Sequence, residues 1–169
     1  MNVPVASSVG LGLGGGPDPS MVQARRWAWW LGLGGLAPFV AHAALAWSGP
    51  AALREWALHS QVLYAAAILT FVGALHWSLA LAAPTLSPAS RRFGLIWSVL
   101  PSLWCWIAAQ WPARTALLLI ALGLLVALVV DLATYRKLPL PAWFTGMRLL
   151  LTVVATAALV VTWLAPGAR

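Results

Sequence analysis

The sequence predicts an all-α membrane protein, a bundle of five transmembrane helices with the N-terminus in the cytoplasm and the C-terminus outside. Five apolar runs fill most of the 169 residues, and 62% of the residues are hydrophobic, more than a soluble chain of this length could bury. Each run has about 18–22 residues, the length with which a helix crosses a hydrocarbon core of ~30 Å. The predicted spans are Trp27–Trp47, Val62–Ala83, Phe93–Gln110, Thr115–Thr134 and Gly146–Leu164.

The basic residues predict the orientation of these spans. Of the ten Lys and Arg residues, seven fall on one side and three on the other. The seven are Arg25, Arg26, Arg91, Arg92, Arg136, Lys137 and Arg148, and the three are Arg54, Arg114 and Arg169. Because basic loops stay in the cytoplasm, the side with seven is expected to be cytoplasmic. The net charge of +7 is therefore interpreted as a topology signal and not as a sign of nucleic-acid binding.

Two regions are expected along the chain. Residues 1–24 are rich in Gly, Ser and Pro and predict a flexible cytoplasmic tail without the features of a cleaved signal peptide. Residues 25–166 form the five-span domain. Within the tail, Gly10–Gly15 matches the dinucleotide-binding fingerprint, but no strand precedes it and no βαβ unit surrounds it. The match is interpreted as a coincidence of composition.

Each predicted span contributes polar or unusual residues, taken here in chain order. The first contains Pro38 and His42, and the second contains Tyr64, Thr70, His76, Trp77 and Ser78. The third contains Ser98, Pro101, Ser102 and Cys105, the fourth ends in Asp131, and the fifth contains Arg148 and Thr152. Polar groups inside a bilayer are costly, so they commonly mark the functional part of a membrane protein. Trp77, Trp97, Trp104 and Trp106 are expected to pack between helices, and Cys105 is expected to be a small packing residue.

The predicted topology brings several of these residues to one depth. Four of the five spans contribute polar groups in the cytoplasmic part of the membrane, and together they define a candidate polar pocket. Its residues are His76, Trp77, Ser98, Ser102, Asp131 and Arg148. Two interpretations remain open. The residues form a structural network, with an ion pair between Asp131 and Arg148, or they bind a lipid headgroup, a quinone or a small anion.

No cofactor, metal site or catalytic residue is expected. A haem would need both His42 and His76, which differ in predicted depth by about 12 Å at 1.5 Å per residue. No second carboxylate or histidine lies at ligand spacing beside either histidine, which argues against zinc or di-iron. No arrangement of nucleophile, base and orienting residue is visible either.

The polar segments resemble a known family. The motifs that carry the resemblance are Gly34–Phe39, Tyr64 with Ile68–Trp77, Ser98–Leu103 with Trp106, and Asp131 with Leu138–Thr152. They are similar to a bacterial family of unknown function related to mitochondrial transmembrane protein 69, over about Trp27–Leu164. The chain departs from the family pattern at Ala74 and Ser78, where glycines are usual. The resemblance implies a multi-span fold in the bacterial inner membrane and supplies no activity.

These observations predict a small multi-pass protein of the bacterial cytoplasmic membrane, more an accessory or interaction component than an enzyme. The alternative is an intramembrane binding protein or enzyme for a lipid, quinone or small anion that uses the polar pocket. The expected partners are the lipid bilayer and a membrane protein or a second copy of the chain. Small residues at Gly32–Ala37 and Gly73 would permit close helix contacts in either case.

Overall fold

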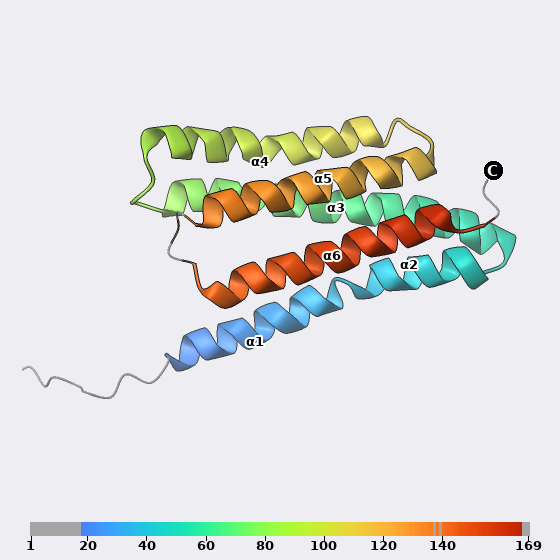
Figure 1. Ribbon diagram of the computed structural model, residues 1–169, viewed down its shortest axis with the longest axis horizontal. Helices are drawn as coiled ribbons and strands as arrows, with labels where there is room; N and C mark the ends of the chain where they lie inside the picture. The colour runs from blue at the N-terminus through green and yellow to red at the C-terminus, as the bar shows by residue number, and fades with distance from the viewer. Residues whose placement is uncertain (1–17, 137, 139, 167–169) are drawn as a thin grey trace, which may run out of the picture.

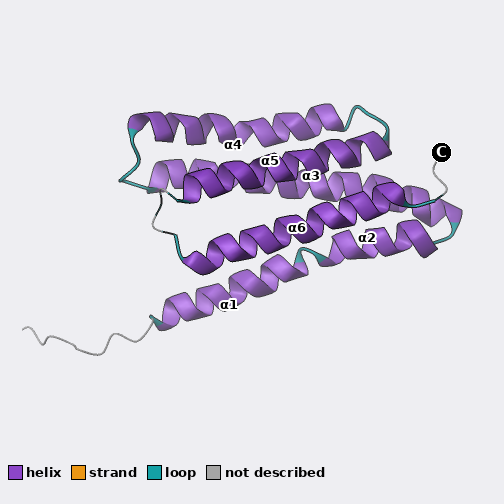
Figure 2. Cartoon of the chain, viewed as in Figure 1, coloured by secondary structure: helices purple, strands orange, loops and turns teal. Residues whose placement is uncertain are grey.

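The computed structural model describes residues 18–136, 138 and 140–166, and its regular elements there are all helices (Figures 1 and 2). The helices are α1 (Pro19–Gly34), α2 (Ala37–Ser48), α3 (Ala51–Ala82), α4 (Pro88–Ala108), α5 (Ala113–Tyr135) and α6 (Ala142–Leu164). The Gly10–Gly15 motif and most of the predicted tail lie outside the described residues. Residues 19–24, which were included in the tail, lie in α1.

The helices run side by side along one long axis, with α1 and α2 in line (Figure 1). The α3–α4 and α5–α6 connections lie at the end of the bundle where α1 begins, and the α2–α3 and α4–α5 connections lie at the other end. The last residues of α6 are at that other end, so the chain enters and leaves the bundle on opposite sides. We call the end that holds the start of α1 the α1 end.

The first predicted span is broken into two helices. The α1 helix ends at Gly34, and α2 begins at Ala37 with Pro38 in its first turn, where a missing N–H is tolerated. Because Pro38 cannot donate to a preceding carbonyl, the helix cannot continue unchanged through this point. The Tyr64 hydroxyl on α3 donates to the Gly35 carbonyl at 2.9 Å, which satisfies one exposed backbone group at the break. The break therefore follows from a proline that the sequence displays.

The second predicted span begins too late. It was placed at Val62, whereas α3 begins at Ala51 and is 32 residues long. The added segment is more polar, but it is amphipathic, with Ala57, Leu58 and Gln61 buried against the bundle. The Gln61 side-chain amide donates to the Phe39 carbonyl at 3.4 Å. Continuous hydrophobicity was the wrong criterion for the start of this helix, because packing needs only one apolar face.

Four stretches of the described chain are long and apolar enough to cross a membrane: Pro19–Ser48, Ala51–Ala82, Ala113–Tyr135 and Ala142–Leu164. The chain is therefore a multi-pass membrane protein. The α4 helix, predicted as the third of five spans, is not among the four. It has 21 residues, but two arginines, five serine or proline positions and three tryptophans lower its hydropathy. The mean hydropathy of α4 is thus lowered in part by Ser98, Ser102 and Pro101, which the sequence analysis singled out as unusual residues of this span.

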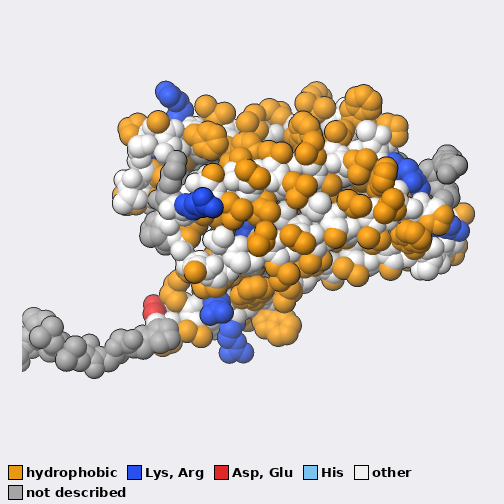
Figure 3. Space-filling model, in the orientation of Figure 1, with side chains coloured by type: hydrophobic (Ala, Val, Ile, Leu, Met, Phe, Trp, Pro, Cys, Tyr) orange, Lys and Arg blue, Asp and Glu red, His pale blue; other side chains and the backbone are white. Residues whose placement is uncertain are grey.

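Large apolar side chains cover the outside of the bundle, as expected of a surface that faces lipid (Figure 3). Most Lys and Arg side chains visible in that view lie toward the two ends. The interior is built from small and branched residues, among them Ala65, Leu69, Leu117, Ile120 and Leu159. The contact between α3 and α4 is especially close, because a Cβ added at Gly73 would meet the Pro101 ring at 2.6 Å. Small residues thus permit tight helix packing, as the sequence suggested.

A buried charge network beside an apolar cavity

A charge network buried inside the bundle joins three helices. Asp131 on α5 accepts a hydrogen bond from Arg148 Nε on α6 at 2.6 Å, and its other oxygen lies 2.7 Å from His76 Nε2 on α3. Asp131 is completely buried, and His76 and Arg148 are 1% and 7% exposed. The predicted pair of Asp131 and Arg148 is therefore present, and the sequence did not indicate that His76 shares the same carboxylate. Loss of one partner of a pair this deeply buried strongly destabilises the folded protein.

The network continues along α6 through Thr152. Arg148 Nη1 donates to Thr152 Oγ1 at 2.6 Å, and the same hydroxyl donates to the Arg148 carbonyl at 2.9 Å. The spacing of four residues places both side chains on one face of the helix. Thr152 is 1% exposed, so its hydroxyl and the guanidinium satisfy each other away from solvent. Sequence reading noted Thr152 but did not place it in the candidate pocket.

Two aromatic side chains enclose His76. The Tyr135 ring stacks on the imidazole with centroids 6.1 Å apart and an interplanar angle of 16°. Trp97 on α4 meets the same ring edge-on, at 6.5 Å and 80°. Tyr135 was assigned to the α5–α6 connection and so was missed. Its position one turn after Asp131 on a helix would have placed it on the same face.

Three buried polar atoms around this network have no hydrogen-bond partner within the described part of the chain. They are Arg148 Nη2, the Tyr135 hydroxyl oxygen and Trp97 Nε1. All three groups can donate a hydrogen bond, and two of them can only donate. Unpaired buried donors are costly, and two of these atoms, Arg148 Nη2 and the Tyr135 hydroxyl oxygen, belong to side chains that lie next to each other. They leave donor capacity that an acceptor from outside the protein could use.

An apolar cavity of about 450 Å³ adjoins the network, between the α1–α2 pair and helices α3, α5 and α6. Two polar side chains line it, Arg148 and Thr152, and its other lining residues are apolar or glycine. Gly32 of α1, Leu75 of α3 and Leu151 of α6 are among them. A volume of this size is within the range of small-molecule sites in proteins. The cavity thus combines a long apolar wall with one cationic group.

The structure brings some of the predicted pocket residues together and separates others. His76, Asp131 and Arg148 are in contact, whereas Trp77 is 50% exposed on the outer surface of α3 and takes no part in the network. Ser98 is buried, but its hydroxyl donates to the Leu95 carbonyl at 2.7 Å. Ser102 is partly exposed and donates to the Val99 carbonyl in the same way. Both serines bond to carbonyls of their own helix three residues earlier, as serine side chains commonly do in helices.

His42 belongs to a different place in the bundle. Its Nδ1 lies 2.6 Å from the Pro38 carbonyl and its Nε2 lies 2.8 Å from Ser60 Oγ on α3. Ser60 and His76 are sixteen residues apart on the same helix, which is about 24 Å at 1.5 Å per residue. Both ring nitrogens of His42 are thus occupied far from His76. Among the described residues, no group of three or more His, Cys, Asp or Glu side chains is placed to hold a metal.

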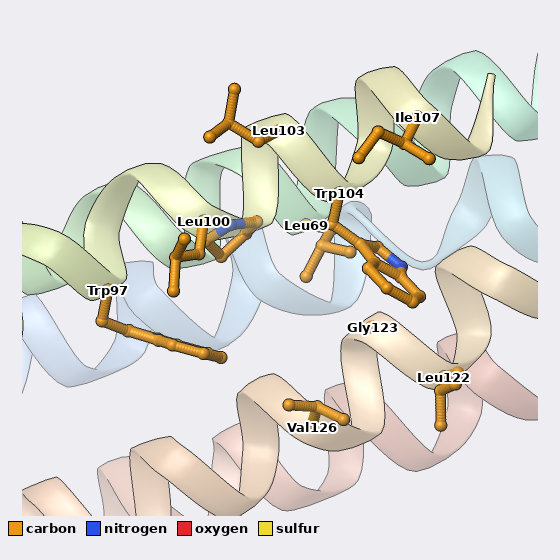
Figure 4. A pocket seen from close by; sticks show the side chains of 10 residues that line it. Leu69, Trp97, Leu100, Leu103, Trp104, Ile107, Leu122, Gly123 and Val126 are labelled. Atoms are coloured by element: carbon orange, nitrogen blue, oxygen red, sulfur yellow. The ribbon is translucent and has the colours of Figure 1, made fainter. Parts of the chain in front are cut away.

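A second cavity, of about 440 Å³, lies between α4 and α5 (Figure 4). Its lining is apolar apart from the indole nitrogens, with Trp97 at one end and Trp104 near Gly123 at the other. Trp104 Nε1 donates to the Leu119 carbonyl at 2.7 Å, so that nitrogen is satisfied. The predicted packing role therefore suits Trp97 and Trp104, while Trp77 and Trp106 are 50% and 66% exposed and face outward instead.

Comparison with known proteins places these features in a family. The family described as "Protein of unknown function (DUF3429)" matches residues 24–164. Transmembrane protein 69 of Xenopus tropicalis is 37% identical over 144 residues, covering 83% of this chain and 55% of the relative. Transmembrane protein 69 of Mus musculus is 33% identical over 145 residues, covering 84% and 57%. The chain thus spans little more than half the length of these relatives. No solved structure matches. The resemblance seen in the sequence motifs is confirmed.

Proposed function

The chain belongs to the DUF3429 family, and from that premise we propose that it binds a small amphipathic molecule inside the membrane. The molecule has an apolar body, which occupies the cavity between α1, α3 and α6, and a head group that accepts hydrogen bonds from Arg148. A lipid-derived molecule or a quinone has this character. The cavity favours this binding role over the purely accessory role that composition alone suggested.

The observation that carries the proposal is the position of Arg148. Its guanidinium is held by Asp131 and Thr152 on two sides, lines an otherwise apolar cavity, and retains one buried donor atom without a partner among the described residues. A structural ion pair alone requires neither the cavity nor the remaining donor. A side chain oriented by two fixed partners is also well suited to position a ligand, because little conformational freedom is lost when the ligand binds.

The proposal includes five membrane spans, with α4 as the fifth. Two observations support this. The α4 helix lies alongside α3 and α5 over most of their length (Figure 1), and its outer face exposes Ile96, Val99, Leu103, Trp106 and Ile107. A helix with an apolar outer face beside two spanning helices has the surroundings of a span. An odd number of spans also suits the start of α1 and the end of α6, which lie at opposite ends of the bundle (Figure 1).

The proposed location is the bacterial cytoplasmic membrane, with the α1 end of the bundle in the cytoplasm. The side with seven basic residues corresponds to that end, and the first half of α1 and the first turns of α4 hold Arg25, Arg26, Arg91 and Arg92. The charge network then lies in the cytoplasmic half of the membrane. His76 is six residues from the end of α3 and Arg148 is six from the start of α6, about 9 Å in each case.

Identification of molecules that co-purify with the protein tests the binding role. Ala28 lines the cavity from α1, and Ala24 lies one turn earlier on an exposed face outside the lining. We expect mass spectrometry of the wild-type protein in mild detergent to find one enriched class of amphiphile. Ala28→Phe should lose that class because the ring occupies the cavity, and Ala24→Phe should keep it. Equal lipid profiles for both variants and the wild type would contradict the proposal.

A further inference from the structure

We propose that the head group of this amphiphile is an anion, and that it binds together with one proton taken up by His76. The inference rests on the proposed function, because it concerns the same cavity. It specifies the chemical class of the ligand. It also explains why His76 lies beside the ion pair of Asp131 and Arg148, which needs no third group.

The network is electrically balanced before a ligand binds. Asp131 is the only acidic residue of the chain after Glu55, and it pairs with one permanent cation, Arg148. With His76 neutral, the buried network has no net charge. An anion added beside Arg148 would then be an uncompensated charge in a low-dielectric interior, which is unfavourable. One proton on His76 restores neutrality, because two cations then face Asp131 and the ligand.

The remaining hydrogen-bonding atoms suit an acceptor. Arg148 lines the cavity, and its Nη2 can only donate; the Tyr135 hydroxyl beside the guanidinium can donate as well. A carboxylate or sulfonate offers acceptors alone and forms stronger hydrogen bonds with a guanidinium than a neutral oxygen does. A head group with hydrogen-bond donors of its own would place those donors against the donors of the protein, without an acceptor for either. The available atoms therefore favour an anion.

His76 is placed to hold the proton. Its Nε2 lies 2.7 Å from one oxygen of Asp131, and Arg148 occupies the other oxygen. Protonation changes a hydrogen bond into an ion pair without moving either group. The groups that face this histidine are Trp97 from α4, Asp131 and Tyr135 from α5, and Arg148 from α6. Arg91 of α4 is turned to the Ala80 and Ala83 carbonyls at the end of α3. Of these side chains, the imidazole is the one that becomes a cation by gaining one proton.

Binding measured as a function of pH tests the inference. The protein is placed in nanodiscs of a neutral phospholipid, and equilibrium binding of two probes with the same chain is compared. Hexadecyl sulfonate stays anionic at every pH used, and hexadecanol is neutral, so any pH dependence of sulfonate binding belongs to the protein. We expect sulfonate affinity to fall about tenfold per pH unit on the alkaline side of the His76 titration, as required for uptake of one proton. Hexadecanol should bind weakly and without this slope.

Two histidine variants assign the proton to its site. His76→Gln keeps one donor toward Asp131 but cannot titrate, so the slope should vanish. His42→Gln, in the separate Pro38–Ser60 cluster, should keep the full slope. Thermal unfolding of both variants verifies that they are folded, and the wild-type slope stands as a test without either variant.

The possible failures are distinguishable. Saturable binding of both probes with equal affinity and no pH dependence would overturn the proton-coupled anion and leave the proposed binding role intact. A sulfonate slope that persists in His76→Gln would overturn the assignment to His76. If neither probe binds saturably at any pH between about 5 and 8.5, the inference is wrong, and so is the proposed binding of single-chain amphiphiles.

Discussion

At the scale of single residues, Asp131 connects three helices. One carboxylate contacts a permanent cation on α6 and a titratable ring on α3, and it is completely buried. Buried ion pairs contribute less to stability than their short distances suggest, because both charges have lost their hydration. Their removal is costly for the same reason, since the remaining charge has no partner. The network is therefore best examined by paired substitutions.

Asp131→Asn and Arg148→Gln should each lower the free energy of unfolding, by about 3–5 kcal/mol, because the first leaves the Arg148 charge without its partner and the second leaves Asp131 with His76 alone. The double variant should lose less than the sum of the two, since no charge remains without its partner. Thermal unfolding in one detergent, for the wild type and all three variants, completes the cycle. Additive losses would show that the two side chains do not interact.

Tyr135→Phe separates packing from ligand binding. The hydroxyl makes at most a long contact with the neighbouring Arg148 guanidinium, so its removal should change the free energy of unfolding by less than about 1 kcal/mol and keep the stacking on His76. If the hydroxyl contacts the head group, the affinity for hexadecyl sulfonate should fall several-fold. Calorimetric unfolding and the nanodisc binding measurement give the two values. A large loss of stability with unchanged affinity would assign Tyr135 to structure alone.

At the scale of elements, all five apolar runs were correctly predicted to be helical, and four of them lie in stretches long and apolar enough to cross a bilayer. The helix ends and the break in the first span were not predicted. Pro38 was visible, but whether a proline kinks a helix or starts a new one depends on a partner such as Tyr64, which is 29 residues away from Gly35. The start of α3 was missed because an amphipathic turn has no continuous apolar run.

The contact between α3 and α4 depends on Gly73. A methyl group there would meet Cγ of the rigid Pro101 ring at 2.6 Å, so Gly73→Ala should lower the free energy of unfolding by about 1–3 kcal/mol. Gly146→Ala is the matched control, because nothing lies within 4 Å of its Cβ position. It should leave stability unchanged or raise it by up to about 1 kcal/mol through helix propensity. Equal melting temperatures for the two variants would refute the close contact.

The candidate site was predicted in part for a related reason. Depth along each helix placed His76, Asp131 and Arg148 at one level, and all three are in the network. Depth does not give the angle around a helix axis, so Trp77 was included although it is on the outside, and Tyr135 and Thr152 were left out. A helical projection of α5 and α6 would have added them, whereas Trp97 required the position of α4 relative to α3.

At the scale of the whole molecule, the charge distribution and the arrangement of the helices predict the same topology. The start of α1 and the end of α6 lie at opposite ends of the bundle (Figure 1). A reporter that is active only outside the cytoplasm should be silent within residues Pro84–Pro88 and active after Arg169. Activity at Gln110–Pro112 tests α4 itself. A silent reporter there, with silence at Pro84–Pro88, would mean that α4 does not cross the membrane.

The central claim is that the cavity beside Arg148 holds an amphiphile, and photocrosslinking tests it most directly. A sixteen-carbon sulfonate with a diazirine in its chain is added to the protein in nanodiscs, irradiated and mapped by mass spectrometry. We predict crosslinks concentrated on Leu75, Met147 and Leu151, which line the cavity, and their loss in Ala28→Phe but not in Ala24→Phe. Crosslinks spread evenly over outward-facing residues such as Leu63, Ile96 and Val129, and unchanged in both variants, would contradict the account.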